Sequence, residues 1–436
     1  MYQQPGSPED KQTPETIEQF QEVNEGLEVG WSHSTPREAL SPIFTIDGQV
    51  RYQGHRTLAI WGNGNTAACG FWSKRVPVRP GTYYRFQVTF RCEAIEDPDL
   101  TLVHSVLWRN CSSDVNCPQD HIEHFSQSGQ WTVGEGIFRA PSGVSEAEMR
   151  LYYRWSAAGK VWWGYAALTE AQAVAPRLVK VGVWAGGVPS KSTDRTEHLQ
   201  FWENAIDTLS ACGADLILLP ETINLIGAGD VISMADVVPG GPFFDVLAAS
   251  AAKHHAWVCG GLLERCRDLV YNSACLLDPA GRLAGLYRKT HLYWPEVLQG
   301  ITPGNGLQVF DTRLGKVGVM ICYDSWWPEV SHLLAAGGAD IVLFPNAGYE
   351  PAIATARAID NSLYLAISSL YGPASIIDPS GSSVVRTEKG GVVGLLDLSV
   401  KPQCHPNAGG SLNGAPGGRS ATRNSLLPAE SHRAEA

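Results

Sequence analysis

Apolar and polar residues alternate along two stretches in the first part of the chain. Every second position is apolar from Tyr84 to Cys92 and again from Met149 to Trp155. This period of two is typical of half-buried antiparallel strands. Turn sequences rich in proline and glycine at 79–82 and 140–143 separate the stretches. The pattern predicts an all-β sandwich of jelly-roll type over residues 26–172.

From residue 178 the pattern changes to short, continuous apolar runs, such as Leu216–Leu219 and Val317–Ile321. Such runs are typical of strands that are buried on both faces. Helical periodicity follows the first strands, and one helical face carries Leu199, Trp202, Ile206 and Leu209. A second helix is predicted from Pro328 to Ala336. Buried strands that alternate with helices predict an α/β domain over residues 178–400.

The α/β region contains an internal repeat. Three segments recur in the same order, 180–183 as 316–319, 213–221 as 338–346, and the Asp-Pro-x-Gly turn 278–281 as 378–381. One half of this kind cannot bury both faces of its sheet alone. Two equivalent halves that pack sheet to sheet, with helices outside, solve this in a four-layer α-β-β-α sandwich. Equivalent strand ends then meet at one pocket, because ligands bind at the carboxyl ends of parallel strands.

Side chains with useful chemistry stand just past these strands. Cys322, Glu221 and Asn346 each follow or end an apolar run, and Lys289 closes a hairpin strand. A cysteine nucleophile needs a base and oxyanion donors, roles that suit Glu221 and Lys289. Considered one at a time, each residue also has a purely structural explanation. The cysteine could be a buried apolar residue, Glu221 and Lys289 could form a salt bridge, and Glu296 could be a surface charge. Together, on a duplicated frame, they favour catalysis.

The helix predicted from Pro328 would direct its amide end toward Cys322. A helix N-terminus stabilises a thiolate. The sequence therefore predicts a lowered pKa for this cysteine.

Residues 178–400 resemble the nitrilase, or carbon–nitrogen hydrolase, superfamily. The matching motifs are Leu-Pro-Glu221, Tyr-Asn272-Ser, Arg-Lys289-Thr-His-Leu, Glu296 before Gly-Ile-Thr-Pro-Gly, Ile-Cys322-Tyr-Asp with Pro-Glu329, and Ala-Arg357-Ala-Ile-Asp-Asn. The resemblance implies a triad of Glu221, Lys289 and Cys322, supported by Glu296. It also implies hydrolysis of non-peptide C–N bonds without metal or cofactor, in homodimers or larger assemblies.

The resemblance extends to the remaining site residues. It implies that the backbone N–H of Tyr323 holds the oxyanion together with Lys289. We expect Asn346 and Tyr349 to bind the oxyanion or the substrate. The substrate would be a small linear amide or N-carbamoyl compound, because Tyr323 and Asp324 stand where true nitrilases tend to have Trp-Glu.

Two alternatives remain open at this point. One is a nitrilase whose cysteine attacks a nitrile carbon, and the other is a binding protein with an inactive hydrolase domain. The first strand ends in Trp184-Ala-Gly-Gly, where the family usually has a glutamine. The segments 346–357 and 368–374 are shorter than usual and normally wall the pocket, which leaves the substrate undefined.

The N-terminal region loosely resembles the carbohydrate-binding-like modules fused to microbial hydrolases. It holds eight tryptophans, namely Trp31, Trp61, Trp72, Trp108, Trp131, Trp155, Trp162 and Trp163. These residues would either stack on a carbohydrate or fill the core. Cys111, Cys117, His121 and His124 form a run that could hold zinc, but its spacing fits no standard zinc module.

The composition of the chain excludes some classes of binding partner. The 436-residue chain has a formal net charge of −11, which argues against a nucleic-acid partner. No apolar run approaches the roughly 18 residues that cross a membrane. Residues 1–25 and 401–436 are polar and aperiodic, and we expect a disordered lead without a signal peptide and a disordered tail. Ten scattered cysteines favour a reducing, cytoplasmic setting.

Overall fold

The computed structural model describes residues 29–110, 119–122, 124–188, 193–227 and 231–399. The lead and tail expected from the sequence fall outside the described residues. In the described part, no helix is both long and apolar enough to cross a bilayer.

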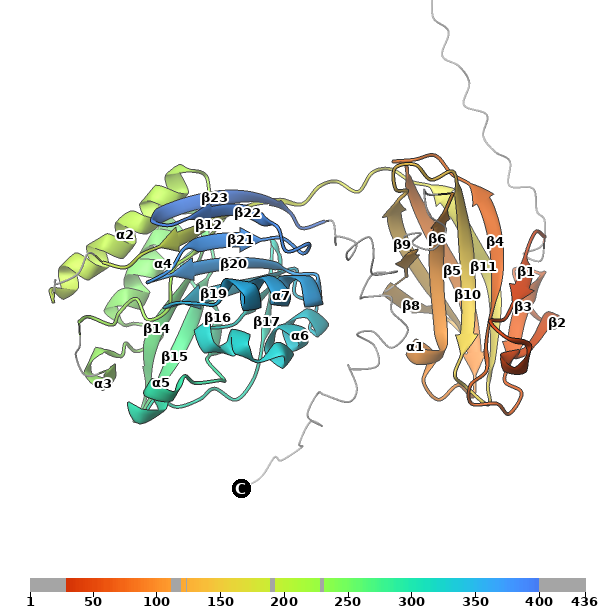
Figure 1. Ribbon diagram of the computed structural model, residues 1–436, viewed down its shortest axis with the longest axis horizontal. Helices are drawn as coiled ribbons and strands as arrows, with labels where there is room; N and C mark the ends of the chain where they lie inside the picture. Colours follow the sequence, from red (N-terminus) through yellow and green to blue (C-terminus); the bar gives the residue numbers. More distant parts are fainter. Residues whose placement is uncertain (1–28, 111–118, 123, 189–192, 228–230, 400–436) are drawn as a thin grey trace, which may run out of the picture.

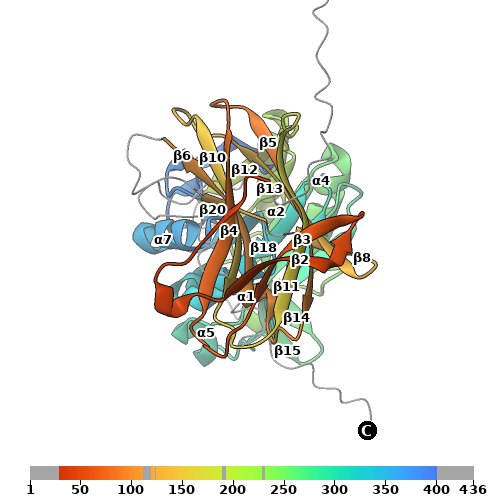
Figure 2. The same ribbon diagram turned by 90° about the vertical axis from the view of Figure 1, so that its right-hand side faces the viewer.

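The N-terminal region consists of two antiparallel sheets (Figures 1 and 2). The first sheet has the order β1 (Ser32–Ser34), β4 (Cys69–Pro77), β10 (Glu146–Arg154), β6 (Leu102–Arg109) and β7 (Gln119–His121). The second has the order β2 (Ile43–Tyr52), β3 (His55–Trp61), β11 (Lys160–Glu170), β5 (Tyr83–Glu93), β9 (Trp131–Arg139) and β8 (His124–Ser128). Both alternating stretches of the sequence are thus strands, β5 and β10. Short helices lie at Glu38–Leu40 and Pro98–Thr101 (α1).

One hydrophobic core joins the two sheets, with Trp72 and Leu151 contributed by the first sheet and Leu58 and Phe86 by the second. Five of the eight tryptophans are buried, namely Trp72, Trp108, Trp131, Trp162 and Trp163. Trp72, Trp108 and Trp163 belong to the core between the sheets, whereas Trp131 and Trp162 form a separate small cluster with Ala59.

The same core encloses a histidine. His104 is 1% exposed, and its Nε2 accepts a hydrogen bond of 2.9 Å from the Trp163 indole N–H. Burial lowers the pKa of His104 to about 3, so this side chain is neutral in the folded protein at ordinary pH.

The α/β region is built from two equivalent sheets. The first consists of β23 (Gly390–Asp397), β12 (Leu178–Ala185), β13 (Leu216–Leu218), β14 (Trp257–Cys266), β15 (Leu269–Leu277) and β16 (Leu283–Arg288). The second repeats this order with β17 (Val309–Thr312), β18 (Gly315–Val319), β19 (Ile341–Asn346), β20 (Tyr364–Ser369), β21 (Ala374–Ile377) and β22 (Ser383–Thr387). The sheets connect through the pair Ala185–Ser369. The internal repeat is therefore a structural duplication.

The repeated turns have matching geometry. Gly281 N–H donates to Asp278 O at 2.8 Å, and Gly381 N–H donates to Asp378 O at 2.9 Å. Both glycines have positive φ values, +77° and +85°, a conformation that favours glycine at the end of such a turn.

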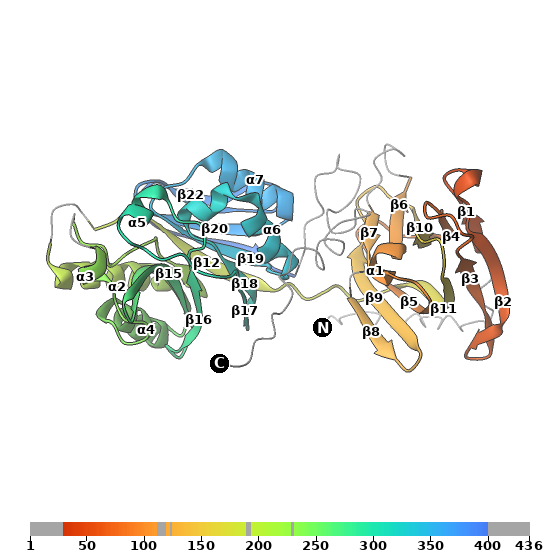
Figure 3. The ribbon, with the colours of Figure 1, turned by 90° about the horizontal axis from the view of Figure 1, so that it is seen from below.

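Helices cover the outer faces of the two sheets (Figure 3). The first sheet carries α2 (Arg195–Ala211) and α4 (Pro242–His254), and the second carries α6 (Pro328–Ala336) and α7 (Pro351–Asn361). The inner faces pack on each other, with Val181 and Leu218 from one sheet and Val319 and Leu343 from the other. This is the α-β-β-α layering that the repeat predicted. Helix α6 has the predicted bounds, and α2 ends just before Gly213, as its periodicity predicted.

Residues 171–177 connect the two regions, which Figures 1 and 3 show as distinct bodies. Their hydrophobic cores have no member in common among the described residues. Each region therefore has a core of its own.

Candidate active site

Glu221 lies past the end of β13, at the centre of the site. Its side chain is buried, and its Oε1 accepts hydrogen bonds from Lys289 Nζ at 2.9 Å and from Asn272 Nδ2 at 2.6 Å. Its Oε2 accepts from the Ala347 N–H at 2.8 Å. Ala347 follows Asn346 at the end of β19, the strand equivalent to β13. Each half of the duplication therefore supplies one side of the Glu221 site, and the corresponding ends of β13 and β19 lie in contact.

Lys289 directly follows β16 and is 1% exposed. Its Nζ also donates to Glu296 Oε2 at 2.8 Å, from the short helix α5 (Trp294–Leu298). Burial opposes the charge of Lys289, but the carboxylates of Glu221 and Glu296 outweigh it and raise the pKa of Lys289. The ammonium is therefore a permanent cation of the site.

Asn272 is a further site residue that the sequence reasoning placed only in a motif. Its amide nitrogen donates both to Glu221 Oε1 at 2.6 Å and to Glu296 Oε1 at 2.5 Å. It lies in β15 and is 1% exposed. A buried asparagine within an apolar strand was the available signal, since a buried amide needs hydrogen-bond partners. Asn272 holds the two carboxylates in fixed positions around Lys289.

Cys322 follows β18 and begins a single 3-10 turn, η3 (Cys322–Trp326). Its φ is +42°, a left-handed value that is rare for residues other than glycine. Its Sγ donates to Gly348 O at 3.5 Å, and the charge of the Glu221 carboxylate acts on the same thiol. Such strained backbone at a strand end is typical of functional positions.

The pKa of Cys322 differs in direction from the sequence prediction. Burial, followed by the negative charge of Glu221, raises the pKa of Cys322 to about 12, although Lys289 and the Ala347 N–H act in the opposite sense. The predicted lowering by a helix N-terminus is wrong, because η3 intervenes between Cys322 and the start of α6 at Pro328. The resting nucleophile is therefore a neutral thiol.

Asp324 connects the cysteine turn to the lysine loop. This side chain is fully buried, and it accepts hydrogen bonds from the Ile321 N–H at 2.8 Å, the Tyr287 hydroxyl at 2.8 Å and the His291 N–H at 3.0 Å. Tyr287 and His291 flank Lys289 in the chain. Asp324 therefore fixes the position of Lys289 relative to Cys322.

The remaining predicted residues occupy different places. The Tyr323 N–H lies in the first turn of η3, where amides have no acceptor within the helix. Asn346 is fully buried, and its Nδ2 donates to Phe344 O at 2.6 Å. The ring of Tyr349 packs against Phe344, 6.2 Å away, in the cluster covered by α6 and α7. The backbone at Ala347 and Gly348 thus contacts the catalytic cluster, while the Tyr349 ring lies on the helix side of the sheet.

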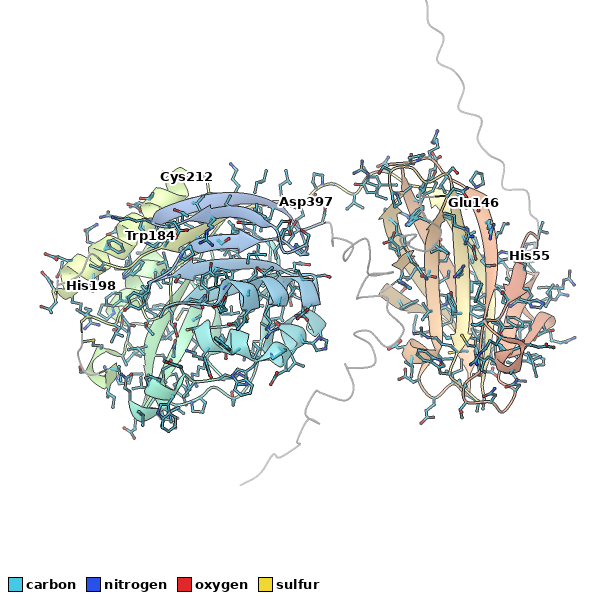
Figure 4. The ribbon with its side chains drawn as sticks, viewed as in Figure 1. His55, Glu146, Trp184, His198, Cys212 and Asp397 are labelled. Atoms are coloured by element: carbon cyan, nitrogen blue, oxygen red, sulfur yellow. The ribbon has the colours of Figure 1, made fainter. Side chains whose placement is uncertain are left out.

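Trp184 lies near the end of β12, the first strand of the α/β region. Its ring lies under α2, 5.9 Å from Phe201 (Figure 4). The side chain is therefore part of the outer core and does not contribute to the catalytic cluster.

The described residues contain no cluster of three or more His, Cys, Asp or Glu side chains that could hold a metal ion. Cys111 and Cys117 of the possible zinc run lie outside the described residues.

Comparison with known proteins found relatives of the α/β region. Residues 183–400 match the carbon-nitrogen hydrolase family. A nitrilase of Pyrococcus abyssi is 32% identical over 215 residues, which cover 48% of this chain and 79% of that protein. A chloroplastic omega-amidase of Arabidopsis thaliana is 26% identical over 262 residues, 52% of this chain and 71% of that protein. Among solved structures, an amidase of Nesterenkonia has a TM-score of 0.46 and 22% identity over 53% of this chain and 92% of that one.

The chain belongs to the carbon-nitrogen hydrolase family, with the α/β fold of the nitrilase superfamily and a sheet-rich N-terminal region.

Proposed function

We propose that this protein hydrolyses the C–N bond of a small linear amide or N-carbamoyl compound through a thioester on Cys322. The observation that carries this proposal is the pairing of a neutral Cys322 thiol with the Glu221 carboxylate, beside the fixed cation of Lys289. A thiol with a raised pKa needs a base at the moment of attack, and Glu221 is the carboxylate whose charge acts on this thiol.

In the first step the Cys322 sulfur attacks the amide carbon while Glu221 takes the thiol proton. Negative charge develops on the amide oxygen, where Lys289 and the Tyr323 N–H stabilise it. Glu221 then gives the proton to the departing nitrogen. The C–N bond breaks, ammonia or an amine leaves, and an acyl thioester remains on Cys322.

In the second step Glu221 takes a proton from water, and the resulting hydroxide attacks the thioester. The C–S bond breaks, the carboxylic acid leaves, and the thiol recovers its proton from Glu221. Glu296 and Asn272 keep Glu221 and Lys289 aligned through both steps. The bonds between heavy atoms that are made and broken involve Cys322, the substrate and one water molecule, while Glu221 only takes and returns protons.

Two other functions predict turnover of different substrates. A nitrilase would release acid and ammonia from nitriles, and an inactive domain would release nothing from either class. The assay incubates the protein with propanamide, N-carbamoyl-β-alanine and propanenitrile, and measures ammonia and acid, with Cys322→Ala as the control. Turnover of an amide or carbamoyl compound that is absent in the control supports the proposal, and turnover of the nitrile alone contradicts it.

We further propose that residues 26–172 form a jelly-roll-type module that folds independently and binds carbohydrate. The separate hydrophobic cores support independent folding. A chain that starts at Ala175 should then fold and keep its kcat on a small amide, because all proposed catalytic residues follow Ala175. A folded fragment with a collapsed kcat would contradict independence. Glycan-array binding by the full-length protein tests the carbohydrate ligand.

A further inference from the structure

Three aromatic side chains form a connected group beside Cys322, here called the aromatic rim: Tyr293, Tyr323 and Trp326. The ring centroids of Tyr293 and Tyr323 lie 5.5 Å apart, and those of Tyr323 and Trp326 lie 6.3 Å apart. Tyr293 is 52% exposed and Trp326 is 53% exposed. Two large aromatic side chains are thus held in contact with a third while much of their surface faces solvent.

The aromatic rim is attached to the catalytic residues through the backbone. Tyr323 directly follows Cys322, and both Tyr323 and Trp326 belong to the turn η3. Tyr293 is the N-cap of α5, and its N–H donates to Glu296 Oε2 at 2.7 Å. The rim therefore borders the catalytic cluster.

The cation that contacts the turn η3 is Arg357, whose Nε donates to Ser325 O at 2.9 Å and whose side chain is 11% exposed and paired with Asp360. The other segments around the site carry few cations. Segments 290–312 and 317–356, which follow Lys289 and contain Cys322, have no lysine or arginine. Other segments at the strand ends near the site also lack lysine and arginine. These segments are 184–188, 219–227 and 368–373. Lys289 itself is buried and bound to two carboxylates. The exposed charges on the cysteine segment and the next one include the carboxylates of Glu329 and Glu350.

We propose that the aromatic rim binds the part of the substrate beyond its amide group, and that this part is uncharged and apolar, with an aromatic ring preferred. This inference rests on the proposed amide hydrolysis. Aromatic rings attract other rings and apolar surface. A carboxylate at the far end of the substrate would find exposed acidic neighbours, and the nearby Arg357 is already bound to Ser325 O and Asp360. The enzyme would accordingly discriminate against amides of dicarboxylic acids.

The first experiment compares 3-phenylpropanamide with propanamide, which differ only in the phenyl ring. The quantity is the ratio of their kcat/KM values, so that a general change in catalysis cancels. Trp326→Ala should lower this ratio about tenfold, as expected for the loss of ring contacts and buried area. The control is Trp155→Ala, which removes an exposed tryptophan in the N-terminal region and should leave the ratio unchanged.

The second experiment compares succinamate with its methyl ester, which has the same chain without the charge. The ester should have the higher kcat/KM by about tenfold, because the anion meets uncompensated negative charge. A preference for succinamate would overturn the charge argument.

The outcomes separate this inference from the proposed function. If no amide is hydrolysed, the proposed function fails. If propanamide is hydrolysed but Trp326→Ala leaves the ratio unchanged, the rim does not bind substrate. A second copy of the chain is the competing occupant of the rim. A change in molar mass by light scattering in Trp326→Ala, with the substrate ratio unaltered, would assign the rim to an interface between copies.

Discussion

The ammonium of Lys289 lies 2.9 Å from Glu221 Oε1 in a place where both side chains are almost fully buried. Removing one partner of a buried ion pair leaves the other uncompensated, which costs about 3–5 kcal/mol. Here Glu296 provides a second negative partner for Lys289 at 2.8 Å. The site can therefore lose the charge of Glu221 and still neutralise the lysine, which makes Glu221→Gln an informative variant.

We expect Glu221→Gln to remain folded and to lose kcat by about 10²–10⁴, the usual range for general acid–base catalysis. The glutamine keeps the shape of the side chain but cannot take the thiol proton. Steady-state ammonia release measures kcat, and circular dichroism verifies folding. Glu203→Gln, which changes a carboxylate on α2 that is 39% exposed, is the control. A rate close to that of the unmodified protein would remove Glu221 from the mechanism.

Asp324→Asn tests the connection between the cysteine turn and the lysine loop. The new amide group would face donors at Tyr287, Ile321 and His291, and an unsatisfied buried group costs about 1–3 kcal/mol. We expect a lower melting temperature together with a fall in kcat of about tenfold or more, because Lys289 loses its alignment. Asp360→Asn, a carboxylate that is 59% exposed, should alter neither quantity. Lower stability with unchanged kcat would limit Asp324 to a structural role.

Alkylation of cysteines tests the state of the nucleophile. The raised pKa of Cys322, about 12, keeps it as a thiol at pH 7–8. N-ethylmaleimide, which reacts with thiolates, should therefore modify Cys322 more slowly than the exposed Cys212. Peptide mapping by mass spectrometry after timed quenching gives both rates. Preferential labelling of Cys322, with a midpoint below pH 7, would show a preformed thiolate and contradict the neutral resting state.

His104 should make stability depend on pH. Its folded pKa of about 3 is below the unfolded value of 6.5, so the unfolded chain binds the extra proton between these values. Its stabilising effect is complete above pH 6.5 and is lost as pH falls toward 3, by about 2 kcal/mol between pH 7 and pH 5. Urea unfolding followed by tryptophan fluorescence measures this loss.

The matched variant is His104→Gln, which offers Trp163 an acceptor without titrating in this range. Between pH 7 and pH 5 the free energy of unfolding of this variant should fall by about 2 kcal/mol less than that of the unmodified protein. An unchanged pH dependence in this variant would mean that His104 is not the responsible group.

The internal repeat made much of the α/β frame predictable. Apolar runs mark the parallel strands, and a polar residue directly after such a run must lie at the carboxyl edge of the sheet. Glu221 and Cys322 could be placed in this way from the sequence. Lys289 could be placed at a hairpin end, and the structure brings all three together with Glu296.

What the sequence did not predict depends on contacts between distant segments. Asn272 was visible as a polar residue in an apolar strand, but its double contact with Glu221 and Glu296 requires the folded hairpin and α5 together. The pKa of Cys322 depends on burial and on the distance to Glu221, neither of which follows from local sequence. The helix-terminus argument used only local sequence and therefore gave the wrong direction.

The proposed reaction passes through a thioester between the substrate acyl group and Cys322. The most direct test mixes the enzyme rapidly with propanamide, quenches in acid and records intact-protein and peptide masses. We expect a transient mass increase equal to one propanoyl group, located on the Cys322 peptide, released by hydroxylamine and absent from Cys322→Ala. Turnover of propanamide by Cys322→Ala would contradict this mechanism. An adduct on another residue of the unmodified protein would contradict it as well.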